Sequence, residues 1–186
     1  LLLRSFGNYA HSEAHKMIVG HRSSTAVMGA YSLGGEIGAM PTSELLTPLN
    51  RVFFPLFVQK GNDRAALQRA YLLALGIQAL IGVPAGLGLS LVAEEVVLCF
   101  LGIKWMAAVP FIQVIAGFNL VGAFSNSSGS LLLARGKAKI SAICVWAQIA
   151  VFLVLVEFWL PAGDALAVAR LRLGVAVAGL ALYGFF

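Results

Sequence analysis

Long apolar runs separated by short polar segments dominate the chain. Residues 72–93 carry no charged side chain, and neither do residues 105–134. A third apolar run covers 140–160, and a fourth covers 165–186 and contains two arginines. A helix needs roughly 20 apolar residues to cross the hydrocarbon core of a bilayer. The four runs therefore predict membrane-spanning helices.

The first third of the chain is less regular. Residues 24–58 are apolar but are interrupted by three prolines and three charged residues, so we expect a kinked helix there. Residues 1–20 carry several charged side chains, which a membrane tolerates only where they face protein or a water-filled cavity. We predict an all-α fold, a polytopic transmembrane helical bundle of about six spans in a single lobe. The approximate spans are 1–20, 24–58, 68–93, 105–134, 140–160 and 165–186.

Composition supports a membrane protein. Hydrophobic residues make up 60% of the chain and charged residues only 11%, and the mean hydropathy is +0.89. Soluble domains have about 25% charged residues, so a soluble fold of this length would leave large apolar patches exposed. The net charge of +5 does not predict nucleic-acid binding, because the basic residues are dispersed between apolar segments.

The dispersed basic residues predict an orientation in the membrane. Lysines and arginines gather in the connections at 59–69 and 135–139, which we expect to be cytoplasmic. The connections at 94–104 and 157–164 are acidic or nearly so, and we expect them to face outward. Arg22 on a predicted outward turn, and a pair of arginines just past another, do not follow this rule and need a cavity or a route to the headgroups.

Charges within predicted spans are the main functional lead, because such charges usually face a cavity or a partner. Glu44 and Arg51 are seven residues apart, nearly one helical face, and Glu36 lies eight residues before Glu44. Together the three residues predict one wall of a polar cavity for an anionic cargo. Alternatively, Glu44 and Arg51 neutralise each other, or Arg51 extends to the cytoplasmic headgroups. The candidate cavity residues are Arg4, His15, Lys16, Glu36, Glu44, Arg51, Asn126, Arg170 and Arg172.

Other chemistry is weakly indicated. The polar patch at 125–130, with Asn126, suits hydrogen bonds to sugars, but small polar residues in membrane helices more often serve helix packing. His11 and His15 have i, i+4 spacing without a third ligand, which is a weak metal signal. No catalytic motif is present, so we expect no enzyme activity, no cofactor and no metal site.

Several short segments, taken together and in order, resemble the Wzx-type polysaccharide flippases, in the superfamily that also contains the multidrug MATE transporters. They are AHKMIVG (14–20), MGAYS (28–32), RVFFP (51–55), NDRAALQRAY (62–71), PAGLGLSLVAE (84–94), LGIKW (101–105), SGSLLLARG (128–136) and AVAR (167–170). The family usually has an acidic residue where this chain has His15, which puts any role of that carboxylate in doubt.

The resemblance implies two six-helix lobes around a central cavity, of which this chain would supply the second. We therefore expect a C-terminal-lobe fragment whose partners are membrane lipids, an N-terminal lobe of the same protein and a lipid-linked oligosaccharide. The implied function is translocation of undecaprenyl-pyrophosphate-linked oligosaccharides across the bacterial inner membrane, for lipopolysaccharide or exopolysaccharide synthesis. The alternatives are a cation-coupled drug exporter, with Glu36 or Glu44 as the ion site, and a membrane-embedded glycan polymerase or ligase.

Overall fold

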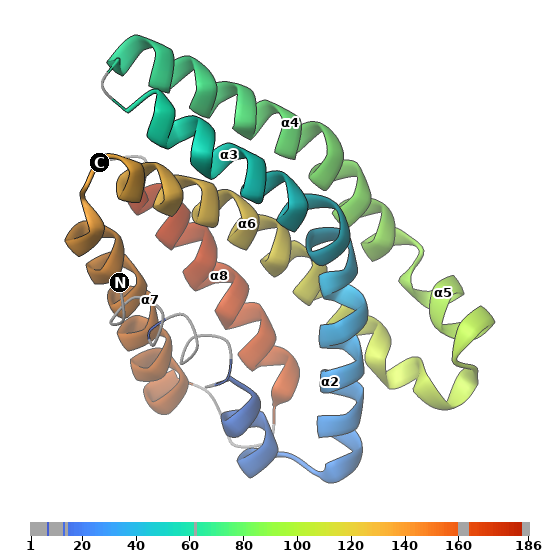
Figure 1. Ribbon diagram of the computed structural model, residues 1–186. Coiled ribbons are helices and arrows are strands. Elements are labelled where there is room, and N and C mark those ends of the chain that lie inside the picture. The colour runs from blue at the N-terminus through green and yellow to red at the C-terminus, as the bar shows by residue number, and fades with distance from the viewer. Residues whose placement is uncertain (1–6, 8–12, 14, 62, 160–163, 184–186) are drawn as a thin grey trace.

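The computed structural model describes residues 7, 13, 15–61, 63–159 and 164–183, and within these ranges every regular element is helical (Figure 1). The all-α prediction is confirmed. Residues 15–22 form a helix that precedes the labelled elements. The remaining helices are α2 (Thr25–Met40), the π-helical turn η1 (Pro41–Leu46), α3 (Thr47–Gln59), α4 (Arg64–Leu91), α5 (Ala93–Phe100), the 3-10 helix η2 (Ile103–Ala108), α6 (Val109–Ala134), α7 (Ala138–Trp159) and α8 (Ala165–Tyr183).

Polar side chains define where several helices begin. The Asp63 carboxylate accepts hydrogen bonds from the backbone N–H groups of Ala65 and Ala66, at 2.9 and 3.1 Å, and so caps the start of α4. The Asp164 carboxylate accepts from Ala167 N–H at 2.8 Å and starts α8 in the same way. Such caps satisfy the backbone donors that a first helical turn leaves without partners.

The expected kink in the 24–58 run lies at η1, between α2 and α3. Pro41 stands at the start of η1 and has no N–H to donate to the preceding turn. The local change to π-helical hydrogen bonding allows the chain to continue as a helix while its axis bends, as Figure 1 shows. Pro84, by contrast, lies inside α4 without ending it.

Helix α6 is the centre of the bundle, because it contacts α2, α3, α4, α7 and α8. It packs closely against α2, where glycines replace larger side chains. A Cβ atom on Gly34 would lie 2.6 Å from Cβ of Phe111, and one on Gly38 would lie 3.1 Å from the backbone nitrogen of Ala116. The Gly34-x-x-x-Gly38 spacing therefore serves close helix packing, as it commonly does in membrane helices.

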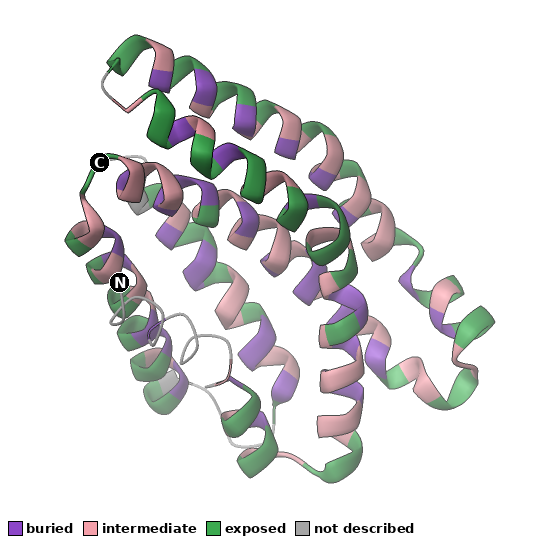
Figure 2. Cartoon of the chain, viewed as in Figure 1, coloured by how far each residue is buried: buried purple, intermediate pink, exposed green. Residues whose placement is uncertain are grey.

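Three helical segments are long and apolar enough to span a membrane: Arg64–Leu91, Ile103–Ala134 and Ala138–Phe158. They correspond to the predicted spans at 68–93, 105–134 and 140–160. Figure 2 shows exposed residues along the outer faces of the helices. On α4 the large apolar residues among them include Leu72, Leu73, Leu80 and Leu87. Exposed leucines on a long apolar helix are suited to lipid contact. The chain is a helical membrane protein.

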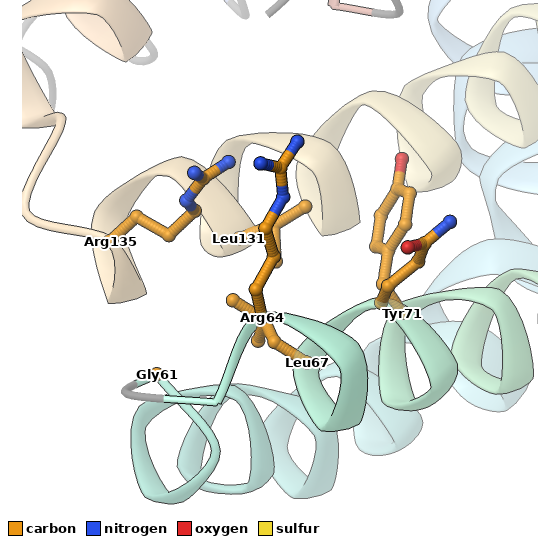
Figure 3. A pocket seen from close by; sticks show the side chains of 7 residues that line it. Gly61, Arg64, Leu67, Tyr71, Leu131 and Arg135 are labelled. Atoms are coloured by element: carbon orange, nitrogen blue, oxygen red, sulfur yellow. The ribbon is translucent and has the colours of Figure 1, made fainter.

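The two basic connections lie at the same end of the bundle. The turn between α3 and α4 packs against the end of α6, and Gly61, Arg64 and Arg135 line one pocket there (Figure 3). Gly136 adopts a positive φ of 73°, which lets the chain reverse directly after α6. This common end agrees with the alternation of basic and acidic connections in the sequence, and its cytoplasmic orientation stays a prediction.

Candidate functional site

A polar cluster joins the N-terminal helix to α8. His15 is only 5% exposed, and Nη1 of Arg172 donates a hydrogen bond to its Nε2 over 2.9 Å. A guanidinium group can only donate, so this contact requires the neutral imidazole with Nε2 as acceptor. Cζ of Arg172 also lies 3.9 Å from the centroid of the Phe118 ring in α6. Three segments that are distant in the sequence therefore meet at the guanidinium group of Arg172.

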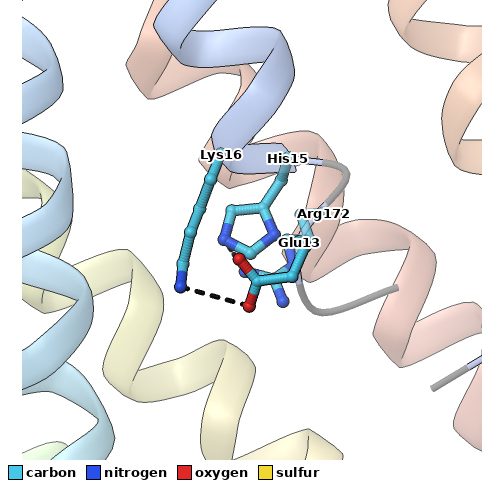
Figure 4. Close-up of polar contacts among 4 residues, drawn as sticks. All are labelled: Glu13, His15, Lys16 and Arg172. Carbon is cyan, nitrogen blue, oxygen red and sulfur yellow. Dashed lines mark hydrogen bonds and ion pairs between the residues drawn. The ribbon is translucent and has the colours of Figure 1, made fainter. Parts of the chain in front are cut away.

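Lys16 and Glu13 complete this cluster on its exposed side. Nζ of Lys16 lies 3.3 Å from Oε1 of Glu13, and both side chains are partly accessible to solvent. Figure 4 shows the Glu13 carboxylate between the Lys16 ammonium and the Arg172 guanidinium. Among the charged side chains drawn there, two are cationic and one is anionic, so the cluster retains an excess of positive charge.

Aromatic rings form the inner wall of the same cluster. The ring centroids of His15 and Tyr31 are 5.6 Å apart, and the ring of Tyr31 packs edge-on against Phe111 at 5.4 Å. Tyr31 is 2% exposed. Tyr31 and Phe118 were not selected as site residues from the sequence. The MGAYS segment, which contains Tyr31, was the signal that could have identified Tyr31.

A second polar network lies between α3, α4 and α6. Gln78 is fully buried, and its Nε2 donates to Oδ1 of Asn50 at 2.8 Å and to Oγ of Ser127 at 2.7 Å. Ser127 in turn donates to Oδ1 of Asn50 at 2.9 Å. Two turns earlier on α4, the Tyr71 hydroxyl lies 2.7 Å from the hydroxyl of Ser128, the residue after Ser127. Asn50, Gln78 and Tyr71 were also missed by sequence reasoning, because single polar residues in apolar runs carry no pairing information.

The polar patch at 125–130 thus splits between two environments. Ser127 and Ser128 are buried and make the interhelical hydrogen bonds that the packing interpretation favours. Asn126, the residue singled out in the sequence, is exposed. Neighbouring helical positions are about 100° apart around the axis, so adjacent residues cannot all face the same partner.

The other predicted cavity residues are not part of either cluster. Glu36, Glu44, Arg51 and Arg170 are all exposed. No ion pair between Glu44 and Arg51 is found in the part of the chain that the structure describes, and Glu44 accepts a hydrogen bond from Ser43. Their predicted common face assumed α-helical spacing, and the π-helical turn at η1 changes that register. Arg4 lies outside the described residues.

Arg170 and Arg172 have separate environments because they are two residues apart on α8. A two-residue step rotates a helix by about 200°, so the side chains point to opposite sides. Arg170 is exposed, whereas Arg172 is partly buried against His15 and Phe118. Only Arg172 of this pair joins Lys16 in the polar cluster.

Arg22, which does not follow the orientation rule, has a partner across the bundle. Its guanidinium forms an ion pair with the Glu157 carboxylate near the end of α7 and also reaches the carbonyl oxygen of Val156. The charge is therefore balanced at the end of the bundle opposite to the basic connections. Among the described residues, no three His, Cys, Asp or Glu side chains are grouped as a metal site would require.

Residues 1–110 match the model of a family described as polysaccharide biosynthesis protein. The chain belongs to the polysaccharide biosynthesis protein family. The match includes His15, Lys16 and Tyr31 of the polar cluster, whereas Phe118 and Arg172 lie beyond it.

Relatives of this polysaccharide biosynthesis protein come from several bacteria. It is 28% identical over 125 residues to the teichuronic acid biosynthesis protein TuaB of Bacillus subtilis, covering 67% of this chain and 26% of that protein. It is 28% identical over 134 residues to the lipopolysaccharide biosynthesis protein WzxC of Escherichia coli, covering 72% of this chain and 27% of that protein. The amylovoran biosynthesis protein AmsL of Erwinia amylovora is 26% identical over 155 residues, covering 82% and 40%.

The matched regions thus span between a quarter and two fifths of the length of these relatives. No solved structure matches the chain.

Proposed function

We propose that this chain is part of a flippase that moves lipid-linked oligosaccharides, carried on undecaprenyl pyrophosphate, across the bacterial inner membrane. The observation that carries the proposal is the position of Arg172 within the bundle. It is the eighth residue of α8, about 10 Å along the helix from its start, and it lies against His15 and Phe118. A cation at such depth is costly unless it serves a cavity or a partner.

The charge of the cluster suits an anionic cargo. Lys16 and Arg172 exceed the single carboxylate of Glu13 drawn beside them, and arginine can bind phosphate or carboxylate oxygens with two parallel hydrogen bonds. In this proposal Arg172 and Lys16 bind the pyrophosphate or acidic sugars. His15 and Phe118 act as positioning residues that hold the guanidinium group in place. The names of the relatives all refer to polysaccharide synthesis, which favours a glycan over a drug as cargo.

We further propose that a second lobe completes the cavity. The relatives are about two and a half to four times as long as the stretch they share with this chain. Two lobes rocking about a shared basic site would give alternating access, while the lipid tail of the carrier stays in the bilayer. Within this arrangement the exposed Glu36, Glu44, Arg51 and Arg170 are available to face the second lobe.

The test is export by the full-length protein carrying Arg172→Ala, produced in place of the wild type. Loss of one charge-assisted contact is expected to lower export about tenfold or more. Surface polysaccharide and oligosaccharide retained on the cytoplasmic side are measured together, with protein abundance in the membrane as the check on folding. Lys104→Ala, an exposed lysine in η2, is the matched control.

Unchanged export with Arg172→Ala at normal abundance would refute this assignment. Arg51→Ala and Arg170→Ala test the rest of the wall that the sequence predicts. If these two variants alone lower export, the cargo passes along the exposed faces of α3 and α8 instead of the cluster at His15.

A further inference from the structure

A pocket between the start of α4 and the end of α6 is separate from the polar cluster described above. Its cavity volume is about 290 Å³. Arg64 and Tyr71 from α4, and Leu131 and Arg135 from the end of α6, are among the residues that line it. Figure 3 shows the Arg64 and Arg135 side chains extending from their two helices to the same side.

The charge of this pocket is positive and uncompensated. Both guanidinium groups are exposed, and neither has an ion pair or side-chain hydrogen bond with the described residues. No acidic residue lines the pocket. The nearest acid in the sequence, Asp63, is engaged by the backbone N–H groups of α4. Two like charges with no partner in the described chain point to an anionic ligand.

Residues of the pocket wall are hydrogen-bonded and packed within the bundle. The Tyr71 hydroxyl is hydrogen-bonded to Ser128, which in turn donates to the carbonyl oxygen of Phe124. Leu67 and Leu131 belong to or pack against the apolar cluster around Phe57, so the pocket floor is part of the packed bundle. The two arginines therefore extend from helices that pack directly against each other.

The depth of the pocket indicates where the ligand comes from. Arg64 is the first residue of one candidate membrane span, and Arg135 directly follows the last residue of another. Both side chains thus stand where apolar helices emerge, at the level of lipid headgroups. Leu72, two turns further along α4 and about 80° round the helix from Arg64, is an exposed apolar side chain suited to an acyl chain. Basic pockets between membrane helices at the cytoplasmic side are suited to lipid headgroups.

We propose that this pocket binds the phosphate group of a membrane lipid, with Arg64 and Arg135 as its ligands. Each guanidinium can donate two hydrogen bonds to phosphate oxygens, and lysine at the same positions could not reproduce that geometry. The lipid phosphate has two possible sources, an anionic phospholipid of the leaflet or the pyrophosphate of a polyprenyl carrier. Only the second source depends on the proposed function.

The experiment uses the purified full-length protein in phosphatidylcholine nanodiscs. Binding of phosphatidylglycerol and, in a second arm, of undecaprenyl pyrophosphate is measured by native mass spectrometry for wild type and for the double variant Arg64→Gln, Arg135→Gln. The control double variant Arg69→Gln, Lys139→Gln removes the same charge from the same end of the bundle but does not touch the pocket. Thermal unfolding of all three proteins verifies that they are folded.

We expect the pocket variant to weaken lipid binding about 30-fold, as two arginines at roughly 1 kcal/mol each imply, and the control to weaken it by less than about threefold. An arginine-dependent loss in either arm supports the proposal, and the arm that shows it identifies the source of the phosphate. Equal losses in the pocket and control variants would overturn the proposal. So would displacement of the lipid by inorganic phosphate at the same concentration. Neither binding measurement requires transport. A failed export test would therefore contradict the proposed function without contradicting lipid binding at this pocket.

Discussion

Arg172 and His15 lie 2.9 Å apart although 157 residues separate them in the chain. The contact ties the helix over residues 15–22 to α8, and the Phe118 ring beneath the guanidinium brings α6 into the same junction. An arginine is suited to this place because one planar group can stack on the ring and donate to the imidazole at once. The junction is therefore a structural element as well as the proposed binding site.

The first prediction concerns Arg172→Lys. An ammonium group keeps the charge but cannot stack on Phe118 and donate to His15 with the same geometry, so the free energy of unfolding should fall by about 1–2 kcal/mol. Denaturant titration of the full-length protein in mixed micelles measures the change. Arg170→Lys on the exposed side of α8 is the control and should be neutral within about 0.5 kcal/mol. Equal stability of the two variants would show that the stacked contact contributes nothing.

The second prediction compares two adjacent glycines of α2. A Cβ on Gly34 would lie 2.6 Å from Cβ of Phe111 and 3.2 Å from backbone atoms of the facing helix, none of which is the end of a flexible side chain. Gly34→Ala should therefore destabilise the protein by about 1–3 kcal/mol. Nothing lies within 4 Å of a Cβ on Gly35, so Gly35→Ala should be neutral or stabilising by up to about 1 kcal/mol.

The glycine pair is measured by thermal unfolding and by the yield of folded full-length protein. Because both variants add the same methyl group to the same helix, helix propensity cancels between them. A larger loss for Gly35→Ala than for Gly34→Ala would mean that α2 packs against α6 through a different face.

The third prediction concerns Asn50, whose Oδ1 accepts hydrogen bonds from Gln78 and Ser127. Asn50→Ala removes the acceptor and leaves two donors in the interior, which should cost about 1–3 kcal/mol of unfolding free energy. Asn126→Ala, an exposed amide on α6, is the matched control and should cost less than about 0.5 kcal/mol. Denaturant titration in micelles checks both values, and equal effects would contradict the network.

The fourth prediction concerns the ion pair of Arg22 and Glu157. The Glu157 side chain is 69% exposed, so water screens the pair and its coupling energy should be only about 0.2–1 kcal/mol. A double-mutant cycle with Arg22→Ala and Glu157→Ala measures this coupling, which should decrease as salt is raised. A coupling above about 2 kcal/mol would mean that the pair is shielded from water in the membrane-embedded protein.

Much of the fold was predictable because helices in a membrane depend on local features. Charge-free runs of the required length predict α4 and α6, and the apolar run at 140–160 predicts α7. The prolines between residues 24 and 58 predict the kink at η1. The predicted span at 165–186 contains α8, and the basic connections at 59–69 and 135–139 lie at one end of the bundle. Family membership, too, was predictable from short segments in order. Whether the chain forms one lobe with about six spans stays a prediction.

The candidate site was predictable only in part, because a single sequence does not show which distant residues come into contact in the folded chain. The sequence by itself determined that this protein is a helical membrane protein, because composition and the length of the apolar runs decide whether a helix can lie in lipid. It also predicted that several charged residues lie within the spans. The tertiary structure alone decided that Arg172 is turned inward and Arg170 outward, and that Ser127 is bonded while Asn126 is exposed. Those distinctions depend on how each helix is rotated about its axis, and that rotation is set by close contacts such as the packing of Gly34 against Phe111.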